Sequence, residues 1–175
     1  MNLLDTTIIT ERLKLVPLSE TYAPEIFREL TEDVTMYMFT KPPKKIEETI
    51  EFIQKARERI MNGEELNVSI FNKNTGEFLG GGGAKKINTR TPELGIWIKK
   101  SAHGNKYGRE AVIALKDWID QHVDHEYIKY PVDKKNIASR KIAEALGGVM
   151  REEYPKENMA GNTLDIVEYW IYRKS

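Results

Sequence analysis

The sequence contains no cysteine among its 175 residues. This absence excludes a disulfide framework, a thiolate nucleophile, a zinc ribbon and an iron–sulfur cluster. A run of about 18 apolar residues is also missing, so no transmembrane helix is expected. The first residues, MNLLDTTIITERLKL, have neither the basic start nor the apolar stretch of a signal peptide. We therefore expect a cytoplasmic protein that has no membrane partner.

Net charge is the second feature that the chain lacks. Its 27 basic side chains balance its 27 acidic ones. There is also no basic strip studded with aromatic residues, so a nucleic-acid partner is not expected. With 40% hydrophobic and 31% charged residues the composition is that of a folded protein. The length fits one domain, and we expect residues 1–175 to form it.

The hydrophobic periodicity predicts strands and helices in a mixed order. Alternating residues predict seven strands, at 12–16, 66–71, 77–86, 93–99, 127–132, 149–154 and 164–172. Helical spacing predicts four helices, at 21–30, 46–60, 108–122 and 137–146. This order indicates an α+β or α/β fold, with a mixed sheet that has helices on both faces. Four successive glycines, 80–83, interrupt one strand and predict a bulge or a close backbone approach.

The segment after the strand at 93–99 combines glycines with positive charge. Gly104 and Gly108 let the backbone wrap closely around a group, just where a helix begins. Lys106 and Arg109 lie at the positive end of that helix, where each is unfavourable by roughly 0.3–1 kcal/mol unless an anion is bound. The next helix start is also cationic, with Lys134, Lys135, Arg140 and Lys141. Two such starts indicate an anionic ligand, although an ordinary turn with solvated charges is the alternative.

Two common nucleotide motifs are absent, since the chain contains neither GxGxxG nor GxxxxGK[ST]. A different family pattern is present. HGNKYGREA, preceded by ELGIWI and followed by NIASRKIAEALGG, resembles the GNAT N-acetyltransferases. The opening TERLKLVPLSE, with Asp165 and Tyr169 in the last strand, resembles the branch that acetylates N-terminal amines of ribosomal proteins. The resemblance covers roughly residues 10–172.

This resemblance implies a GNAT-like, mostly antiparallel twisted sheet of about seven strands. It also implies acetyl-CoA as co-substrate, no metal, an amine-bearing acceptor and the possibility of a homodimer. In the family, a loop of pattern Gln/Arg-x-x-Gly-x-Gly/Ala wraps the pyrophosphate of acetyl-CoA. Here His103 takes the first position, Lys106 the inner glycine and Gly108 the last small residue, so two of the three positions depart from the pattern.

The resemblance also assigns the residues that bind acetyl-CoA. Backbone near Trp97 and Ile98 would hold the thioester carbonyl, and Asn136 would bind the pantetheine arm. Asn136 is equally a good helix N-cap, and both roles are compatible. The wrapping loop consists of His103, Gly104, Asn105, Lys106, Tyr107, Gly108 and Arg109.

Two residues are candidates for the chemistry itself. Glu93 stands where the family often carries a strand glutamate and would deprotonate the amine; a solvated strand-end carboxylate is the alternative. Many family members place a tyrosine at the position of Ala143, so Ser139 is the candidate that meets the leaving thiolate.

Three functions stay open at this stage. We expect acetyl transfer to a primary amine, such as a protein or peptide N-terminus. A small-molecule amine (a polyamine, an amino acid or an antibiotic) is the first alternative, and a CoA-binding module without turnover is the second. The acceptor site is expected between residues 31–44 and 155–161. The cluster of His122, Asp124, His125 and Glu126 is expected to be solvated surface and not a metal site.

Overall fold

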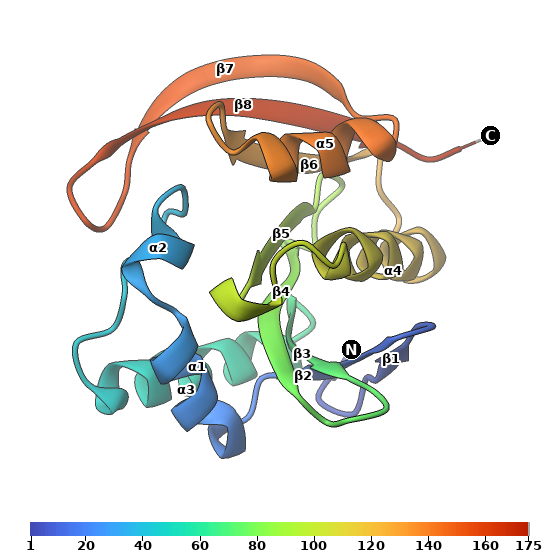
Figure 1. Cartoon of the computed structure of the whole chain (residues 1–175). Helices are drawn as coiled ribbons and strands as arrows, with labels where there is room; N and C mark the ends of the chain where they lie inside the picture. The colour runs from blue at the N-terminus through green and yellow to red at the C-terminus, as the bar shows by residue number, and fades with distance from the viewer. Residues whose placement is uncertain (175) are drawn as a thin grey trace.

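The protein is described by a computed structural model for residues 1–174, so Ser175, the last residue of the expected domain, lies outside the described residues. Its centre is a mostly antiparallel sheet of eight strands in the order β1-β2-β3-β4-β5-β6-β8-β7 (Figure 1). The strands are β1 (Ile8–Ile9), β2 (Leu13–Pro17), β3 (Leu66–Asn72), β4 (Phe78–Lys85), β5 (Glu93–Ile98), β6 (Tyr127–Asp133), β7 (Val149–Glu157) and β8 (Thr163–Tyr172).

The mostly antiparallel sheet of about seven strands is therefore confirmed, with one strand more than the periodicity predicted. The additional strand, β1, has two residues and pairs antiparallel with β2 through Ile8 and Leu15. Two residues are too few to show an alternating pattern. The expected strand at 149–154 also extends to Glu157, because Pro155 is tolerated in β7, which lies at the edge of the sheet.

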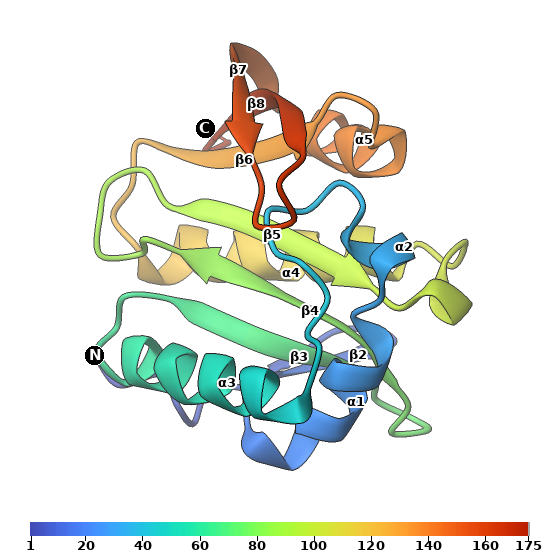
Figure 2. The same ribbon diagram turned by 90° about the vertical axis from the view of Figure 1, so that its left-hand side faces the viewer.

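The helices cover both faces of the sheet, as expected. Figure 2 shows α1 and α3 in front of the sheet and α4 behind it. The helices are α1 (Ala23–Glu29), α2 (Glu32–Thr35), α3 (Ile46–Met61), α4 (Tyr107–His122) and α5 (Ile137–Ala145), with 3-10 turns η1 (Glu20–Tyr22) and η2 (Lys100–Ala102). The expected helix at 21–30 is thus divided between η1 and α1, and the short α2 follows it.

Local capping explains that division. The side chain of Ser19 accepts a hydrogen bond from the backbone N–H of Thr21 and starts η1. Pro24 lies in the first turn of α1, where its missing N–H costs nothing. The Thr31 side chain accepts from the N–H of Val34 and starts α2, which was not expected because four residues carry no helical period.

The glycines of β4 are explained by close backbone contact. A Cβ at Gly83 would lie 2.4 Å from the backbone oxygen of Leu66, and one at Gly82 would lie 2.6 Å from that of Gly95. The register between β3 and β4 also shifts at Ile70 and Phe71. Of the two alternatives for residues 80–83, the close backbone approach is confirmed, and the register irregularity lies just before them, at Leu79.

The expectation for His125 is wrong. Its side chain is fully buried, with Nε2 3.2 Å from Oδ1 of Asp120 and Nδ1 3.2 Å from Arg173 Nη2. The sequence suggested an exposed histidine because His125 follows a helix and lies between two charged residues. Those two residues, Asp124 and Glu126, do lie at the surface, where they form ion pairs with Arg90. Residues 1–174 contain no group of three or more His, Cys, Asp or Glu side chains placed to hold a metal ion. None of the described helices is both long and apolar enough to span a bilayer.

Candidate active site

The sheet opens between β5 and β6. These two strands are parallel and share one register pair, Glu93 with Lys129, where the N–H of Lys129 donates to the carbonyl of Pro92 at 2.8 Å. Beyond that pair β5 stays with β4 as far as Ile98, and β6 stays with β8. The two arms therefore diverge toward their carboxyl ends. Their facing edges carry main-chain groups that no neighbouring strand satisfies.

The pairing with β4 decides which amides of β5 face this opening. The N–H of Lys99 donates to the carbonyl of Leu79 at 2.8 Å, so the backbone polar groups of Lys99 point toward β4. Successive residues of a strand alternate in this direction. Trp97 therefore also directs its N–H toward β4, at its partner Gly81, whereas Ile98 directs its N–H into the opening. The Ile98 amide is thus the donor available to a carbonyl group there.

The loop after β5 is held by its own side chains. Asn105 Nδ2 donates to the carbonyl oxygens of Ala102 and His103, at 3.1 and 3.3 Å. Nε2 of His103 lies 2.7 Å from the carbonyl of Ile98 and must be the donor. In a neutral imidazole Nδ1 is then an acceptor, so His103 can donate to a phosphate through Nδ1 only when the ring is protonated.

Lys106 adopts a backbone conformation that favours glycine. It is the N-cap of α4, with φ 60° and ψ 24° in the left-handed region. The inner glycine of the loop pattern corresponds to this residue, so a lysine here adopts a conformation that glycine adopts at lower cost. The Lys106 and Arg109 side chains are exposed beside the first amides of α4, which have no partner within the helix. Free amides and two cations fit the pyrophosphate of a coenzyme.

Gly108 allows close packing at the start of α4. A Cβ there would lie 3.6 Å from side-chain atoms of both Ile98 and Ile142, and 3.9 Å from Ile96. This position therefore brings β5, α4 and α5 together. The last small residue of the loop pattern lies where these three elements meet.

The start of α4 is also hydrogen-bonded to the first hairpin, which consists of β1, β2 and the turn between them. Glu110 accepts from the Thr10 hydroxyl at 2.5 Å, from the Arg12 N–H at 3.0 Å and from Arg12 Nε at 2.8 Å. Burial alone would raise the pKa of Glu110, but these hydrogen bonds outweigh it and lower the pKa. The Arg12 guanidinium also lies over the Tyr107 ring, 4.6 Å from its centroid. The hairpin thereby positions the first turn of α4.

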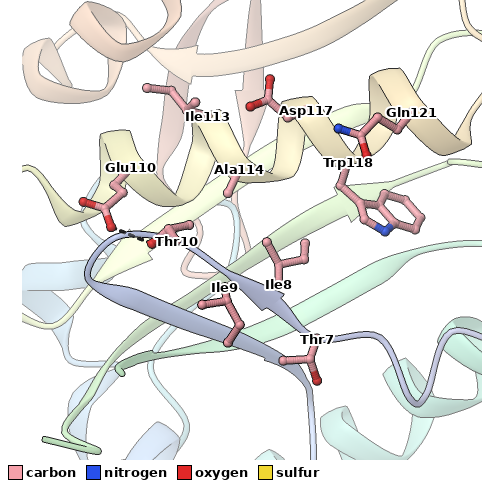
Figure 3. Close-up of a pocket in the computed structure, with 10 residues that line it drawn as sticks. All are labelled: Thr7, Ile8, Ile9, Thr10, Glu110, Ile113, Ala114, Asp117, Trp118 and Gln121. Atoms are coloured by element: carbon pink, nitrogen blue, oxygen red, sulfur yellow. Dashed lines mark hydrogen bonds between the residues drawn. The ribbon is translucent and has the colours of Figure 1, made fainter. Parts of the chain in front are cut away.

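Figure 3 shows this contact at one end of a groove between β1 and α4. The groove has a volume of about 490 Å³, and apolar side chains such as Ile8, Ile113 and Trp118 contribute to its walls. None of the residues expected to bind acetyl-CoA lines it.

The start of α5 forms the other wall of the opening. Asn136 caps this helix by accepting from the N–H of Ser139 at 3.3 Å, as its alternative role as an N-cap required. The Ser139 hydroxyl lies 2.7 Å from the hydroxyl of Tyr130 on β6. Burial raises the pKa of Tyr130 to about 12, although the hydrogen bond with Ser139 acts in the opposite direction.

Glu93 lies on the face of β5 that is directed away from α4 and α5. Strand alternation places it with Gly95 and Trp97, whereas Ile96 and Ile98 face α4 and α5. Its carboxylate is 21% exposed and forms an ion pair of 2.7 Å with Lys86. The opening is thus approached from two sides, one carrying the cationic loop and the other carrying this carboxylate.

The chain matches the acetyltransferase (GNAT) domain family over residues 12–149. It belongs to the GNAT acetyltransferases. As a member of this family it is an acetyl-CoA-dependent enzyme. No curated protein sequence matches it.

Several solved acetyltransferase structures have the same fold. A Salmonella typhimurium acetyltransferase that modifies the N-terminal serine of ribosomal protein L7/L12 superposes with a TM-score of 0.82 and 19% identity, covering 97% of this chain and 100% of that one. Spermidine N-acetyltransferase from Vibrio cholerae, in complex with CoA and spermine, has a TM-score of 0.80 and 19% identity over 93% and 96% of the two chains. A microcin C7 self-immunity acetyltransferase, in complex with acetyl-CoA and AMP, has a TM-score of 0.83 and 18% identity over 98% and 99%.

This GNAT domain also has a buried carboxylate on β8 that the sequence analysis missed. Glu168 on β8 is 3% exposed and accepts from the Tyr154 hydroxyl at 2.8 Å and from Trp170 Nε1 at 2.9 Å. Burial and the bond to Glu168 raise the pKa of Tyr154, and the charges of Glu93 and Glu152 raise it further. One signal was present in the sequence, because a glutamate in the otherwise apolar run IVEYWI is rarely buried without partners.

The GNAT fold also brings together the two segments between which the acceptor was expected. The N–H of Met159 donates to the carbonyl of Phe39 at 2.9 Å, and Asn158 Nδ2 donates to that of Met38 at 3.3 Å. Lys156 lies over the Phe39 ring, 4.6 Å from its centroid. Figure 2 shows residues 36–45 crossing in front of β4 and β5 on the way to α3. This segment therefore passes over the face of the sheet that carries Glu93.

Proposed function

We propose that this GNAT enzyme transfers the acetyl group of acetyl-CoA to a primary amine, with a peptide or protein N-terminus as the acceptor. The observation that carries the proposal is the divergence of β5 from β6 beyond Glu93 and Lys129. It leaves the Ile98 amide facing an opening, with the cationic loop on one side and the Glu93 carboxylate on the other. An acyl donor and an amine can therefore approach the same point from opposite faces.

The loop from His103 to Arg109 binds the pyrophosphate of acetyl-CoA in this proposal. The first amides of α4 donate to the phosphate oxygens, and Lys106 and Arg109 neutralise their charge. Asn136 binds the pantetheine arm while it caps α5. Bound acetyl-CoA supplies a thioester, which is an activated acyl group. No metal is required, because a backbone amide can polarise the carbonyl.

Glu93 acts as the base in this proposal. An alkylammonium has a pKa of about 10.4 and an α-ammonium of about 7.7–8.0, so the amine must lose a proton before it attacks. Glu93 accepts that proton, directly or through water. The amine nitrogen then bonds to the acetyl carbon and loses its second proton to water, the bond from that carbon to sulfur breaks, and the electron pair leaves with sulfur. Ser139 donates a hydrogen bond to the departing thiolate.

Titration calorimetry tests the coenzyme half of the proposal. The wild type should bind acetyl-CoA and CoA at micromolar concentration, and Lys106→Glu should abolish binding because it places a negative charge beside the phosphates. Lys174→Glu is the matched control, since it makes the same charge change at an exposed residue outside the segments proposed to bind acetyl-CoA. Absence of binding to either ligand in the wild type would contradict the proposed function.

The role of Glu93 is tested by its glutamine variant. Glu93→Gln should lower kcat/KM by at least about tenfold near neutral pH, with a smaller loss at high pH, where the free amine forms without a base. The measurement is kcat/KM against pH for one peptide acceptor. A profile unchanged from that of the wild type removes Glu93 from the mechanism.

A small cationic amine is the second candidate acceptor. The observation that favours it is a group of three carboxylates whose negative charges raise the pKa of Tyr154. They are Glu168, Glu93 and Glu152. A panel of N-terminal peptides, polyamines, amino acids and aminoglycosides separates the two acceptor classes by kcat/KM. Tight CoA binding without acetylation of any of these amines would indicate a CoA-binding module.

A further inference from the structure

Tyr130 and Ser139 come from different elements and meet at the wall of the opening. Tyr130 lies on β6 and is 2% exposed, whereas Ser139 lies in the first turn of α5 and is half-buried. Their hydroxyl oxygens are 2.7 Å apart. Within residues 1–174, each of these hydroxyls has the other as its hydrogen-bond partner. The distance alone allows either hydroxyl to be the donor.

Burial decides the direction of this hydrogen bond. A buried hydroxyl proton without an acceptor costs about 1–3 kcal/mol, and Ser139 is the acceptor available to Tyr130. Ser139 has no such constraint, because its partly exposed hydroxyl can donate to water or to a bound molecule. Tyr130 therefore donates to the Ser139 oxygen, and the proton of Ser139 is directed away from Tyr130.

Ser139 lies on the face of α5 that is directed toward β5. Ile142, three residues further along α5, lies on the same face of that helix as Ser139. Side-chain atoms of Ile142 and Ile98 both lie 3.6 Å from the Cβ position of Gly108. The first turns of α5 thus pack close to the end of β5, where the thioester carbonyl is expected.

We propose that Tyr130 is a positioning residue that holds the Ser139 hydroxyl with its proton directed at the sulfur of the coenzyme. This inference rests on the proposed function. Tyr130 itself transfers no proton. Sulfur takes the electron pair of the broken carbon–sulfur bond, Ser139 stabilises that charge by a hydrogen bond, and the thiolate gains its proton from solvent. Because burial keeps Tyr130 protonated, the arrangement is maintained throughout the neutral range.

The test measures the pKa of the thiol of bound CoA, which needs neither acceptor nor turnover. The ultraviolet absorbance of the thiolate is titrated on the CoA complexes of wild type, Tyr130→Phe, Ser139→Ala and the double variant. In the wild type the pKa should lie below the value of about 8.5 typical of a free thiol. Each single variant should raise it by about 1–2 units, since a hydrogen bond to a charged group is lost. The double variant should equal Ser139→Ala, because Tyr130 acts through Ser139.

Tyr169→Phe is the matched control. Tyr169 is also a 2% exposed tyrosine bonded to α5, where its hydroxyl contacts Arg140 at 3.1 Å and Glu144 at 3.0 Å. A loosened α5 would shift the thiol pKa equally in both tyrosine variants, and the inference predicts no shift for Tyr169→Phe. Ser139→Thr retains a hydroxyl and should restore the low pKa.

Two results would overturn the inference. If CoA binds and its thiol has the same pKa in wild type and Tyr130→Phe, the positioning role is wrong, although the proposed function stands. If CoA does not bind the wild type, the proposed function fails, and this inference fails with it.

Discussion

Glu93 lies directly beside Lys129, and this register pair joins β5 to β6. On one side of the pair the sheet is continuous, and on the other the two strands separate. Glu93, the proposed general base, therefore lies at the closed end of the opening into which the Ile98 amide points. A strand glutamate elsewhere in the sheet would not have this relation to an unpaired amide.

The backbone strain at Lys106 predicts that glycine stabilises the protein at this position. A side chain in the left-handed region costs about 1–2 kcal/mol, partly offset by the entropy of glycine in the unfolded chain. Lys106→Gly should therefore raise Tm by about 2–4 °C, as expected for about 1 kcal/mol in a chain of this size. Thermal unfolding followed by circular dichroism provides the measurement.

Lys106→Ala separates charge from strain, because it removes the cation and keeps the Cβ that causes the strain. Both variants should weaken acetyl-CoA binding, whereas only the glycine variant should gain stability. A glycine variant no more stable than the alanine variant would show that the left-handed conformation of Lys106 carries no strain.

The hydrogen bonds of Glu110 predict a dependence of stability on pH. The pKa of Glu110 is lowered from 4.5 in the folded state, so its carboxylate stabilises the fold above that pH. This contribution is lost as the pH falls through the lower folded-state pKa. Glu110→Gln should cost about 1.5–3 kcal/mol at neutral pH, with a difference from wild type that narrows below pH 4.5. Urea unfolding at several pH values measures it.

Glu51→Gln provides the comparison for Glu110. Glu51 also has a lowered pKa, caused by Lys55, but this ion pair is fully exposed on α3. Its removal should change stability little at any pH. Equal effects of the two substitutions would contradict the role assigned to the contact between α4 and the first hairpin.

Two cross-strand glycines should respond very differently to alanine. Gly83 and Gly95 are register partners on β4 and β5. A Cβ at Gly83 would lie 2.4 Å from the backbone oxygen of Leu66, whereas one at Gly95 would have no atom within 4 Å. Gly83→Ala should therefore destabilise the protein by more than about 2 kcal/mol, since backbone must move, and Gly95→Ala should be close to neutral. Chemical denaturation of both variants tests this contrast.

The buried Glu168 predicts an effect on both stability and acceptor choice. Glu168→Gln removes a charge that two donors, Tyr154 and Trp170, are placed to stabilise. It should cost about 1–3 kcal/mol of stability. If a cationic small amine is the acceptor, KM for spermidine should rise several-fold while the Kd for acetyl-CoA stays the same. Steady-state kinetics measure the first constant and calorimetry the second.

Tyr154→Phe provides the control, because it leaves the Glu168 charge in place. It should lower stability but change KM for spermidine less than Glu168→Gln does. An unchanged KM in both variants would remove this carboxylate from acceptor recognition.

The sequence by itself determined the elements with a clear period and the segment that binds the coenzyme in our proposal. Ile53, Ala56 and Ile60 recur at helical spacing and form the buried face of α3. The loop between β5 and α4 was recognisable because its glycines and cations are neighbours in the chain. Local patterns report residues a few positions apart, which is why the two-residue β1 and the four-residue α2 were missed.

Only the tertiary structure decided which distant residues meet. The divergence at Glu93 and Lys129 depends on β6 pairing with β8 beyond that point, a choice made by strands far apart in the chain. Glu168 becomes buried because β7 brings Tyr154 across to it. The directed contact of Tyr130 with Ser139 likewise requires α5 to pack against β6. Such contacts depend on the long-range packing of elements, and residue spacing along the chain does not encode them.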